Sequence, residues 1–514
     1  MTPRVQPRYL ELVEAIESRF AVAGWRSGEV DLWPPARMDL FLDLFRSRAG
    51  DTAPPPAPFI SRLAGSLAAP LTNAWKSRGD LEHWRPWPGP ANAILLGDGV
   101  SLDKVDGAWR DRHGEPVMEA LEGQGLSTFL MQPGALSRLP WARATYAANL
   151  VAVRGATGAA LDRSRRLDLP DHAAVLAFLA TEGAEAPSLS PGALARRART
   201  IAATAQAFRR VLRATRPDLA FVVTYYAGLG HAFALACRAE GILCVDLQHC
   251  PQEGTHRAYR WGDLPEHGFN TLPGAFWTWR QEDAAHIAAW ADGIPEPWHV
   301  AVHGGHSQLT PFLDDDNPVA RDWDQRIAAA AGGGRFEREI LVALQPIGGR
   351  RQVWAELASR IEAAPANWRW WIRRHPSSTR AQDGEYAGLL ALERPNIVLD
   401  AAGDAPLPAL LRRMSALVSL ASGAAAEAAV FGVPALFLDE EAKATFPGLI
   451  QRGQAEMTTP SDLMSRLAQL PARPIRPVAT PTPPLEQTLQ TLFGLARDYR
   501  HLCRAHPLGQ SGSV

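Results

Sequence analysis

The chain has 514 residues, which at roughly 150 residues per domain predicts two to four domains. Hydrophobic residues make up 46% and charged residues 21% of the chain, a globular balance that excludes a disordered or fibrous protein. The 53 basic and 54 acidic residues give a net charge of −1, so no overall positive field is available to hold a nucleic acid, and no nucleic-acid partner is expected.

Residues 1–85 are expected to form a helical extension. Apolar side chains recur at helical spacing over residues 8–23 and 37–48, and prolines interrupt the chain between and after them. The stretch from Met1 to Arg19 lacks the apolar core of a signal peptide. No apolar run reaches the roughly 18 residues that a membrane-spanning helix needs. A cytoplasmic protein is therefore expected.

Residues 86–295 have the pattern of an α/β domain. Short apolar runs predict buried parallel strands, and amphipathic stretches predict helices between them. The predicted strands are 93–97, 126–131, Leu219–Thr224, Leu243–Leu247, Trp277–Trp279 and Val300–Val302, the last just beyond the expected boundary. The predicted helices are 114–123, 142–181, 191–215, Gly228–Glu240 and 281–291.

Residues 296–470 repeat this alternation. The predicted strands are Ile340–Leu344, Trp368–Ile372, Ile397–Leu399, Leu417–Leu420 and Ala435–Leu438. The predicted helices are 350–363, 384–392, 406–413 and 424–431. A proline-rich segment then leads to a final helix at 485–503, so that 471–514 form a linker and a terminal helix. The fold class predicted from this order is α/β, with two Rossmann-like, doubly wound domains and an N-terminal helical extension.

Ligands of open parallel sheets bind at the carboxyl ends of the strands, so the residues that follow each strand of the second domain are candidates for binding. They suit an anion, because they combine cationic side chains, a hydroxyl and glycines at a helix start. These candidates for binding a nucleotide are Gln345, Gly348, Arg373, His375, Ser422, Gly423 and Glu427, the last as an acceptor for ribose hydroxyls. Arg374, beside Arg373, is a further candidate donor to a phosphate.

Each of these signals also has a purely structural interpretation. Ser422 and Gly423 form a dipeptide that commonly caps a helix, both arginines can be solvated surface residues, and His375 can simply end a strand before Pro376. Three such groups at successive strand ends favour a binding site. The tryptophans of the strand 368–372 are expected to belong to the core.

The first domain carries polar residues at the corresponding positions. Asp98 follows its first strand, and Tyr225 follows Thr224, while Gln248, His249 and Glu253 follow Leu247. Asp98 or His249 could take a proton from an acceptor hydroxyl, and Tyr225, Gln248 and Glu253 are expected on the acceptor side. The structural alternatives are a turn residue for Asp98 and a buried, hydrogen-bonded imidazole for His249.

The cysteines predict neither a disulfide framework nor a metal centre. Cys237, Cys244, Cys250 and Cys503 show no CxxC spacing, and a chain of this length with scattered thiols fits a reducing compartment. Cys250 has no recognisable catalytic partner. The acidic run 314–316 is expected to be a solvated turn, so no metal and no cofactor are predicted.

Two motifs add a resemblance to a known family. WWIRRHP followed by LVSLASGAAAEAAVFGVPALFL resembles the donor half of bacterial envelope-polysaccharide transferases with the GT-B architecture, and RPDLAFVVTYYAGLGHAFALACRAEGILCVDLQHC resembles a stretch of surface-carbohydrate biosynthesis proteins. The resemblance covers about residues 90–465. It implies that His375 and Ser422 contact the donor phosphate and that Glu427 lies near the ribose.

The leading hypothesis is a metal-independent glycosyltransferase. It would use a CMP- or UDP-activated sugar as co-substrate and a glycan, a lipid-linked sugar or a protein as acceptor, with a peripheral position at the inner membrane face left open. Asp98 or His249 would deprotonate the acceptor, and Arg373, His375 and Ser422 would neutralise the departing phosphate. The alternatives are an isomerase of the UDP-GlcNAc 2-epimerase type and a non-catalytic scaffold or sugar-sensing relative.

Overall fold

A computed structural model describes residues 5–48, 89–133, 140–161, 166–252, 256–332, 334–345, 348–375, 383–472 and 482–508. The chain divides into two compact units. Unit 1 consists of residues 1–101, 108–305 and 483–514, and unit 2 consists of residues 102–107 and 306–482. The chain therefore leaves unit 1 to form unit 2 and returns to unit 1 with its last helix.

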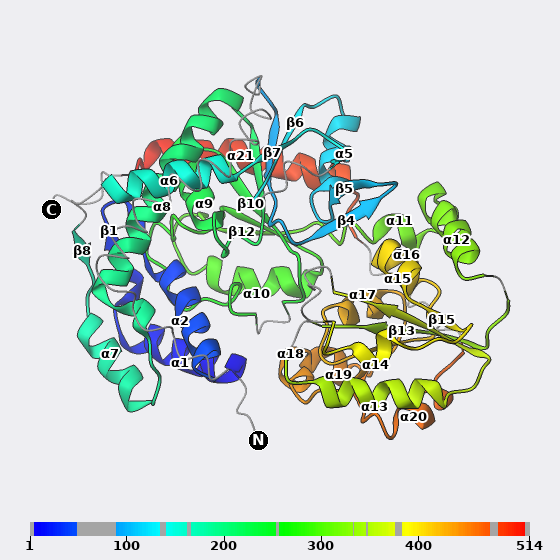
Figure 1. The fold of residues 1–514 in the computed structure, drawn as a ribbon. Helices are drawn as coiled ribbons and strands as arrows, with labels where there is room; N and C mark the ends of the chain where they lie inside the picture. The colour runs from blue at the N-terminus through cyan, green and yellow to red at the C-terminus, as the bar shows by residue number, and fades with distance from the viewer. Residues whose placement is uncertain are drawn as a thin grey trace. The chain divides into compact units, whose positions relative to one another are not determined.

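Unit 1 is built on a seven-stranded sheet with the order β12-β11-β10-β9-β3-β6-β7, in which every pairing is parallel (Figure 1). The strands are β3 (Ala93–Leu96), β6 (Thr128–Gln132), β7 (Thr145–Ala147), β9 (Leu219–Val223), β10 (Leu243–Leu247), β11 (Ala275–Thr278) and β12 (Val300–His303). A two-stranded ribbon of β4 (Leu102–Val105) and β5 (Ala108–Asp111) follows β3.

Successive residues of these strands face opposite layers, as the two-residue period of a strand requires. Ile94 and Leu96 pack with α8 (Pro191–Thr215), α9 (Gly230–Glu240) and α10 (Gln281–Ala291), whereas Ala93 and Leu95 pack with α5 (Glu115–Gly123) and α21 (Leu485–Ala505). Burial on both faces explains why each strand is a continuous apolar run rather than an alternating one.

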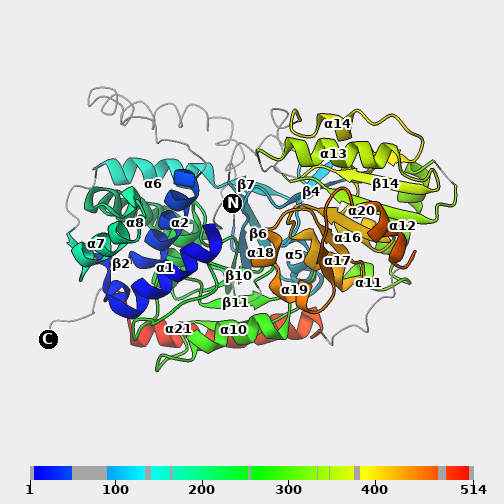
Figure 2. The same ribbon diagram turned by 90° about the horizontal axis from the view of Figure 1, so that it is seen from below.

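The N-terminal helices pack on the first of these layers. They are α1 (Val5–Arg19) and α2 (Trp33–Arg48), with a short three-stranded sheet of β1 (Arg26–Ser27), β2 (Val30–Asp31) and β8 (Leu167–Asp168) beside them. The remaining helices of this layer are α6 (Asn149–Leu161) and α7 (His172–Thr181). Figure 2 shows α1, α2, α6, α7 and α8 together at one end of unit 1.

Unit 2 is built on a six-stranded parallel sheet with the order β15-β14-β13-β16-β17-β18. The strands are β13 (Arg338–Ala343), β14 (Trp368–Arg373), β15 (Ile397–Val398), β16 (Ala416–Ser419), β17 (Ala435–Phe437) and β18 (Ala455–Met457). One face is covered by α13 (Arg351–Glu362), α14 (Ala387–Leu390) and α20 (Leu463–Gln469), and the other by α11 (Thr310–Leu313), α12 (Pro318–Ala330), α15 (Asp400–Asp404), α16 (Leu407–Leu411), α17 (Ala424–Val430), α18 (Ala442–Thr445) and α19 (Pro447–Gln451) (Figure 1).

The predicted fold class is confirmed: two Rossmann-like, doubly wound α/β sheets follow a helical extension. The tryptophans Trp368, Trp370 and Trp371 are at most 4% exposed and belong to the core, as expected. The helical prediction over 142–181 holds for α6 and α7 but is wrong at the start of the range. Thr145–Ala147 pairs with Leu130–Gln132 as a strand instead, because β-branched and aromatic residues there fit the edge of the sheet.

Gly97 directly follows β3, at a position where neighbouring side chains leave no room for a Cβ atom. A Cβ atom there would lie 2.0 Å from Nε2 of Gln132 and 2.4 Å from Oδ2 of Asp111. We expect Gly97→Ala to lower the free energy of unfolding by about 1–3 kcal/mol, the usual cost of overpacking. Urea denaturation measures this loss.

Gly123→Ala is the matched control, since no atom lies within 4 Å of a Cβ built at this end of α5. An equal loss of stability in both variants would contradict the steric explanation.

Candidate functional site

Both sheets have a topological switch point, a place where loops from two neighbouring strands run in opposite directions. In unit 1 the chain forms β3 first, adds β6 and β7 on one side, and then places β9 on the other side of β3. In unit 2 it forms β13, adds β14 and β15 on one side, and then places β16 on the other. Ligands of open parallel sheets bind at such points, outside the carboxyl ends of the strands.

Asp98 and Thr224 meet at the switch point of unit 1, after β3 and β9 respectively. The Thr224 hydroxyl donates to Oδ2 of Asp98 at 3.3 Å. The other contacts of Asp98 are local: its carboxylate accepts hydrogen bonds from the N–H groups of Val100 (2.8 Å) and Ser101 (2.7 Å) and from the Ser101 hydroxyl (2.8 Å). Asp98 therefore organises the turn after β3.

The backbone at Thr224 decides which tyrosine reaches the sheet edge. Thr224 adopts φ 61°, in the left-handed region, and the turn that it forms sends two consecutive tyrosines in different directions. Tyr225 is fully buried, and its hydroxyl donates to the carbonyl of Ala258. Tyr226 is partly exposed, and its hydroxyl lies 2.9 Å from Nε2 of His249. The structure thus gives Tyr225 a packing role and brings Tyr226 to the candidate site.

His249 and Tyr226 form a hydrogen-bonded pair at this edge. Burial lowers the pKa of the His249 imidazole below its ordinary value, while the charge of Asp98 acts in the opposite direction. Burial also raises the pKa of Tyr226 well above 10, so that its phenol keeps its proton and donates to Nε2. A neutral imidazole with a phenol donor is an arrangement that can take up a proton at neutral pH.

Aromatic and polar groups surround this pair. The ring of His113, which is 7% exposed, lies 6.3 Å from that of His249 and stacks on Trp279 at 6.3 Å. Gln248 accepts a hydrogen bond from the Trp279 N–H at 2.7 Å and donates to the Cys250 carbonyl at 2.9 Å, so this amide joins the loops after β10 and β11. Glu253, also predicted on the acceptor side, lies outside the described residues.

The buried carboxyl of Asp111 supports the turn at the switch point of unit 1. Asp111 is fully buried, accepts a hydrogen bond from Nε2 of Gln132 at 2.6 Å, and caps the start of α5 by accepting from the Gly114 N–H at 2.8 Å. The other end of the Gln132 amide accepts from the Gly99 N–H at 3.1 Å. Burial and the charge of Asp98 raise the pKa of Asp111 to about 7. Asp111 therefore positions the turn that contains Asp98.

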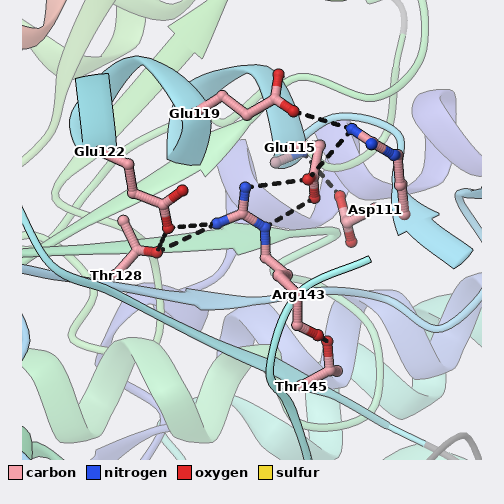
Figure 3. Close-up of polar contacts among 9 residues, drawn as sticks. Asp111, Glu115, Glu119, Glu122, Thr128, Arg143 and Thr145 are labelled. Carbon is pink, nitrogen blue, oxygen red and sulfur yellow. Dashed lines mark hydrogen bonds and ion pairs between the residues drawn. The ribbon is translucent and has the colours of Figure 1, made fainter. Parts of the chain in front are cut away.

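Arginines bind the carboxylates of helix α5, and Arg143 makes the most contacts with them (Figure 3). The Arg143 guanidinium binds both oxygens of Glu115 at 3.0 Å and Glu122 at 2.5 Å. Arg143 lies on the segment before β7 and is 14% exposed, and Glu115 is 9% exposed, so the contact between these two is shielded and two-pronged, of the kind that holds geometry best. Through this contact, the segment before the edge strand β7 holds α5, the helix that Asp111 caps.

The N-terminal helices reach the site through the turn 257–262. Arg37 of α2 is 1% exposed and binds Glu17 of α1 at 2.8 Å, while its other nitrogens donate to the carbonyls of Arg257 and Arg260. The turn so held carries Tyr259, whose hydroxyl donates to Asp246 of β10 at 2.7 Å. The helical extension is therefore part of the support for the loop that follows His249.

Gln345 lies at the switch point of unit 2 and joins its two sides. The side chain follows β13 and makes two hydrogen bonds with the backbone of Ala421, after β16: Nε2 donates to the carbonyl at 3.0 Å and Oε1 accepts from the N–H at 2.8 Å. Ser422 and Gly423 come next, and no described residue accepts a hydrogen bond from the exposed N–H of Gly423. Glu427 is 8% exposed on α17.

The basic residues after β14 divide into two kinds. Arg373 is buried and donates to the carbonyls of Ala402 and Ala405 at 2.6 and 2.5 Å, which makes it a support for α15. Arg374 is exposed and forms an ion pair with Asp383 at 3.3 Å, and His375 is partly buried beside it. Gly348 is exposed after β13. Arg374 replaces Arg373 as the arginine that faces solvent at this edge.

Sequence reasoning placed Tyr226 among the residues that follow Thr224 but gave it no role, and it did not single out four other residues of the site: Asp111, His113, Gln132 and Thr224. Within the described residues, no three or more histidine, cysteine or acidic side chains are grouped so that they could hold a metal ion, and all four cysteines are free. The described part of the chain contains no helix with the length and hydropathy to cross a membrane.

No protein-family model and no curated protein matches the chain. Several solved structures are similar to the chain. The chain is similar to UDP-GlcNAc 2-epimerase from Neisseria meningitidis bound to UDP-GlcNAc, at 12% identity over 79% of this chain and 100% of that one, with a TM-score of 0.46. It is also similar to UDP-GlcNAc 2-epimerase from Methanocaldococcus jannaschii in complex with UDP-GlcNAc and UDP, at 12% identity over 79% of this chain and 99% of that one, with a TM-score of 0.47.

The glycosyltransferase SnogD from Streptomyces nogalater gives 14% identity over 80% of this chain and 95% of that one, with a TM-score of 0.38. At such identities, and with each of these TM-scores below 0.5, the similarities say nothing about substrate or activity. The fold class rests on the two parallel sheets of this chain itself.

The raised pKa of Asp111 predicts a pH dependence of stability. Between about pH 4 and pH 7 the carboxyl keeps its proton in the folded state and loses it in the unfolded state, so stability falls as the pH rises through this window. Asp111→Asn removes this loss. We expect the stability of the variant relative to wild type to increase from pH 5 to pH 8 by on the order of 1 kcal/mol or more.

Denaturant unfolding of both proteins at each pH measures the difference. The substitution weakens the contact with Gln132 at every pH, so only the change of the difference with pH is diagnostic. A constant difference from pH 5 to pH 8 would show that Asp111 ionises at an ordinary pH.

Proposed function

We propose that the protein acts on a nucleotide-activated sugar and transfers the sugar to an acceptor hydroxyl, as a glycosyltransferase. The observation that carries the proposal is that polar groups gather at the switch points of both sheets and are of complementary kinds. Unit 2 presents anion-binding groups, and unit 1 presents a neutral imidazole with a phenol donor.

Unit 2 is assigned the nucleotide. The N–H of Gly423, the Ser422 hydroxyl and the side chains of Arg374 and His375 are donors suited to a phosphate. Gln345 fixes Ala421, the residue before this turn, and so holds the backbone donor in place before a ligand arrives. Such preorganised donors stabilise the charge that develops on a departing phosphate. Helix α17 spans only seven residues, so these individual donors matter more than its dipole.

Unit 1 is assigned the acceptor. The acceptor oxygen attacks the anomeric carbon as the bond from that carbon to the phosphate oxygen breaks. The acceptor proton passes to the Tyr226 oxygen while the Tyr226 proton moves to Nε2 of His249, so that the imidazole ends protonated and the phosphate leaves with the electron pair. Of the two bases predicted from the sequence, His249 fits this role, and Asp98 serves the turn beside it.

Nucleotide binding is the first test. A ligand that binds only the folded state raises the melting temperature, so we expect CMP, CDP, UDP, GDP or ADP to do so selectively and without added metal. Ser422→Ala and His375→Ala should each weaken the shift at least several-fold, because each removes a phosphate donor. The matched controls Ser465→Ala and His501→Ala, at residues on α20 and α21, should leave it unchanged. If no nucleotide at millimolar concentration shifts the melting temperature, the assignment of unit 2 fails and a scaffold role takes its place.

Turnover of the nucleotide-sugar selected by that screen tests the chemistry. We expect His249→Gln to reduce kcat by about 10²–10⁴-fold, the usual contribution of a general base, and Tyr226→Phe to reduce it through the lost relay. Because the pKa of His249 is lowered, the wild-type rate should stay level near pH 7 and fall only as the pH drops below the ordinary histidine range. Chromatography of the nucleotide products follows the reaction.

The same chromatography separates transfer from isomerisation. A transferase releases free nucleotide in proportion to glycosylated acceptor. An epimerase converts the nucleotide-sugar to its epimer without any acceptor and without release of nucleotide. The second pattern would replace the transferase by an isomerase that uses the same two sites.

A further inference from the structure

Helix α8 differs from the other exposed helices in its charge. Over Pro191–Thr215 it carries six arginines and no acidic residue. Helices α12 and α13, by contrast, mix signs: Arg326 pairs with Asp322 on α12 at 2.7 Å, and Arg360 lies 3.8 Å from Glu356 on α13. Interspersed signs are the ordinary state of a surface that only has to be soluble. The uniform charge of α8 therefore calls for an explanation.

The arginines of α8 are concentrated on one face. At 100° per residue, Arg196, Arg199, Arg210 and Arg213 lie together, opposite the buried face that includes Leu194, Ala198, Ile201, Phe208 and Leu212. Arg196 and Arg210 are exposed and 14 positions apart, which corresponds to roughly 21 Å along the helix axis. The cations thus form a stripe along the solvent side of the helix rather than a cluster at one end.

Much of this charge is not compensated within the protein. Arg197 pairs with Asp39 at 3.3 Å, and Arg209 and Arg213 share Glu240 at 2.5 and 2.9 Å. Arg196, Arg199 and Arg210 form no ion pair with any described residue. These three have charge available for a partner.

The neighbouring helix extends the same surface. Helix α6 lies beside α8, where Gly155 and Gly158 face Thr204 and Ala203 closely enough that a Cβ atom would lie 2.1 and 3.1 Å from them (Figures 1 and 2). Within its bounds, α6 also lacks acidic residues, and its one arginine, Arg154, is exposed and forms no ion pair with a described residue. The basic residues of these two adjacent helices that lack an ion pair with a described residue, Arg154, Arg196, Arg199 and Arg210, are called the basic face below.

We propose that this basic face docks unit 1 on an anionic lipid bilayer. An extended row of cations on a helical layer matches a plane of phosphate head groups, to which each basic residue near the surface contributes on the order of 1 kcal/mol. A nucleic acid fits less well, because the exposed positions between the arginines are polar (Thr200 and Gln206) and provide no aromatic ring for stacking bases. The proposal does not depend on the assigned nucleotide or reaction.

Vesicle sedimentation of the full chain tests the proposal. We expect binding to phosphatidylcholine vesicles that contain phosphatidylglycerol, little binding to phosphatidylcholine alone, and release at about 1 M NaCl, where the Debye length is only about 3 Å. The variant R196Q/R199Q/R210Q should lose at least tenfold in partition, since each cation contributes roughly fivefold. Its melting temperature should match that of wild type, because the three side chains are not part of the core.

The control variant R321Q/R360Q/R497Q removes the same charge from α12, α13 and α21, and its vesicle binding should equal that of wild type. Equal binding to neutral and anionic vesicles, or an equal loss in the two variants, would overturn the proposal. So would a single-stranded RNA oligonucleotide that displaces the protein from the vesicles and whose own binding is lost in R196Q/R199Q/R210Q. None of these readouts requires nucleotide or turnover, so they are independent of the proposed function.

Discussion

The left-handed backbone of Thr224 is the constraint on which the candidate site of unit 1 depends. A β-branched residue at φ 61° carries a conformational cost of order 1–3 kcal/mol, and the surrounding contacts have to offset it. They include the hydrogen bond from its hydroxyl to Asp98 and the one from the Tyr225 N–H to Asp246 at 3.2 Å. The same turn sends Tyr225 into the core and leaves Tyr226 beside His249. The unfavourable φ angle of Thr224 thus determines that Tyr226, and not Tyr225, contacts the imidazole of His249.

The support of this site is more extensive than the site itself. Asp111 and Asp246 lie under the loops after β3 and β9, and burial raises the pKa of each to about 7. Each is fixed from another element, Asp111 by Gln132 of β6 and Asp246 by Tyr259. Tyr259 lies in a turn that Arg37 of α2 holds through hydrogen bonds to two backbone carbonyls, and Arg37 also binds Glu17 of α1. The helical extension, which has no recognisable chemistry of its own, therefore helps to hold the loop that follows the candidate base.

The sequence predicted the fold well because burial on both sides leaves a direct trace in it. Strands such as Ile340–Leu344 appear as continuous apolar runs, and the observed β13 (Arg338–Ala343) lies within two residues of that range. The candidate site was harder to predict from the sequence, because the direction of a side chain after a strand can depend on one backbone angle. Tyr225 and Tyr226 are indistinguishable by type and position, and Arg373 and Arg374 are equally so. Asp111 was not identified, because nothing in the local sequence shows that Gln132 of β6 donates a hydrogen bond to it.

Because α21 belongs to unit 1 and every segment of unit 2 precedes it in the chain, unit 1 begins first but is completed last. During synthesis the strands of β13 to β18 are all available before α21 leaves the ribosome. Until then the sheet face formed by Leu219, Phe221 and Leu243 lacks the covering of Leu489, Leu492 and Tyr499. An apolar face of unit 1 thus stays uncovered through the synthesis of an entire second domain, and this interval is when a chaperone would be most useful to the chain.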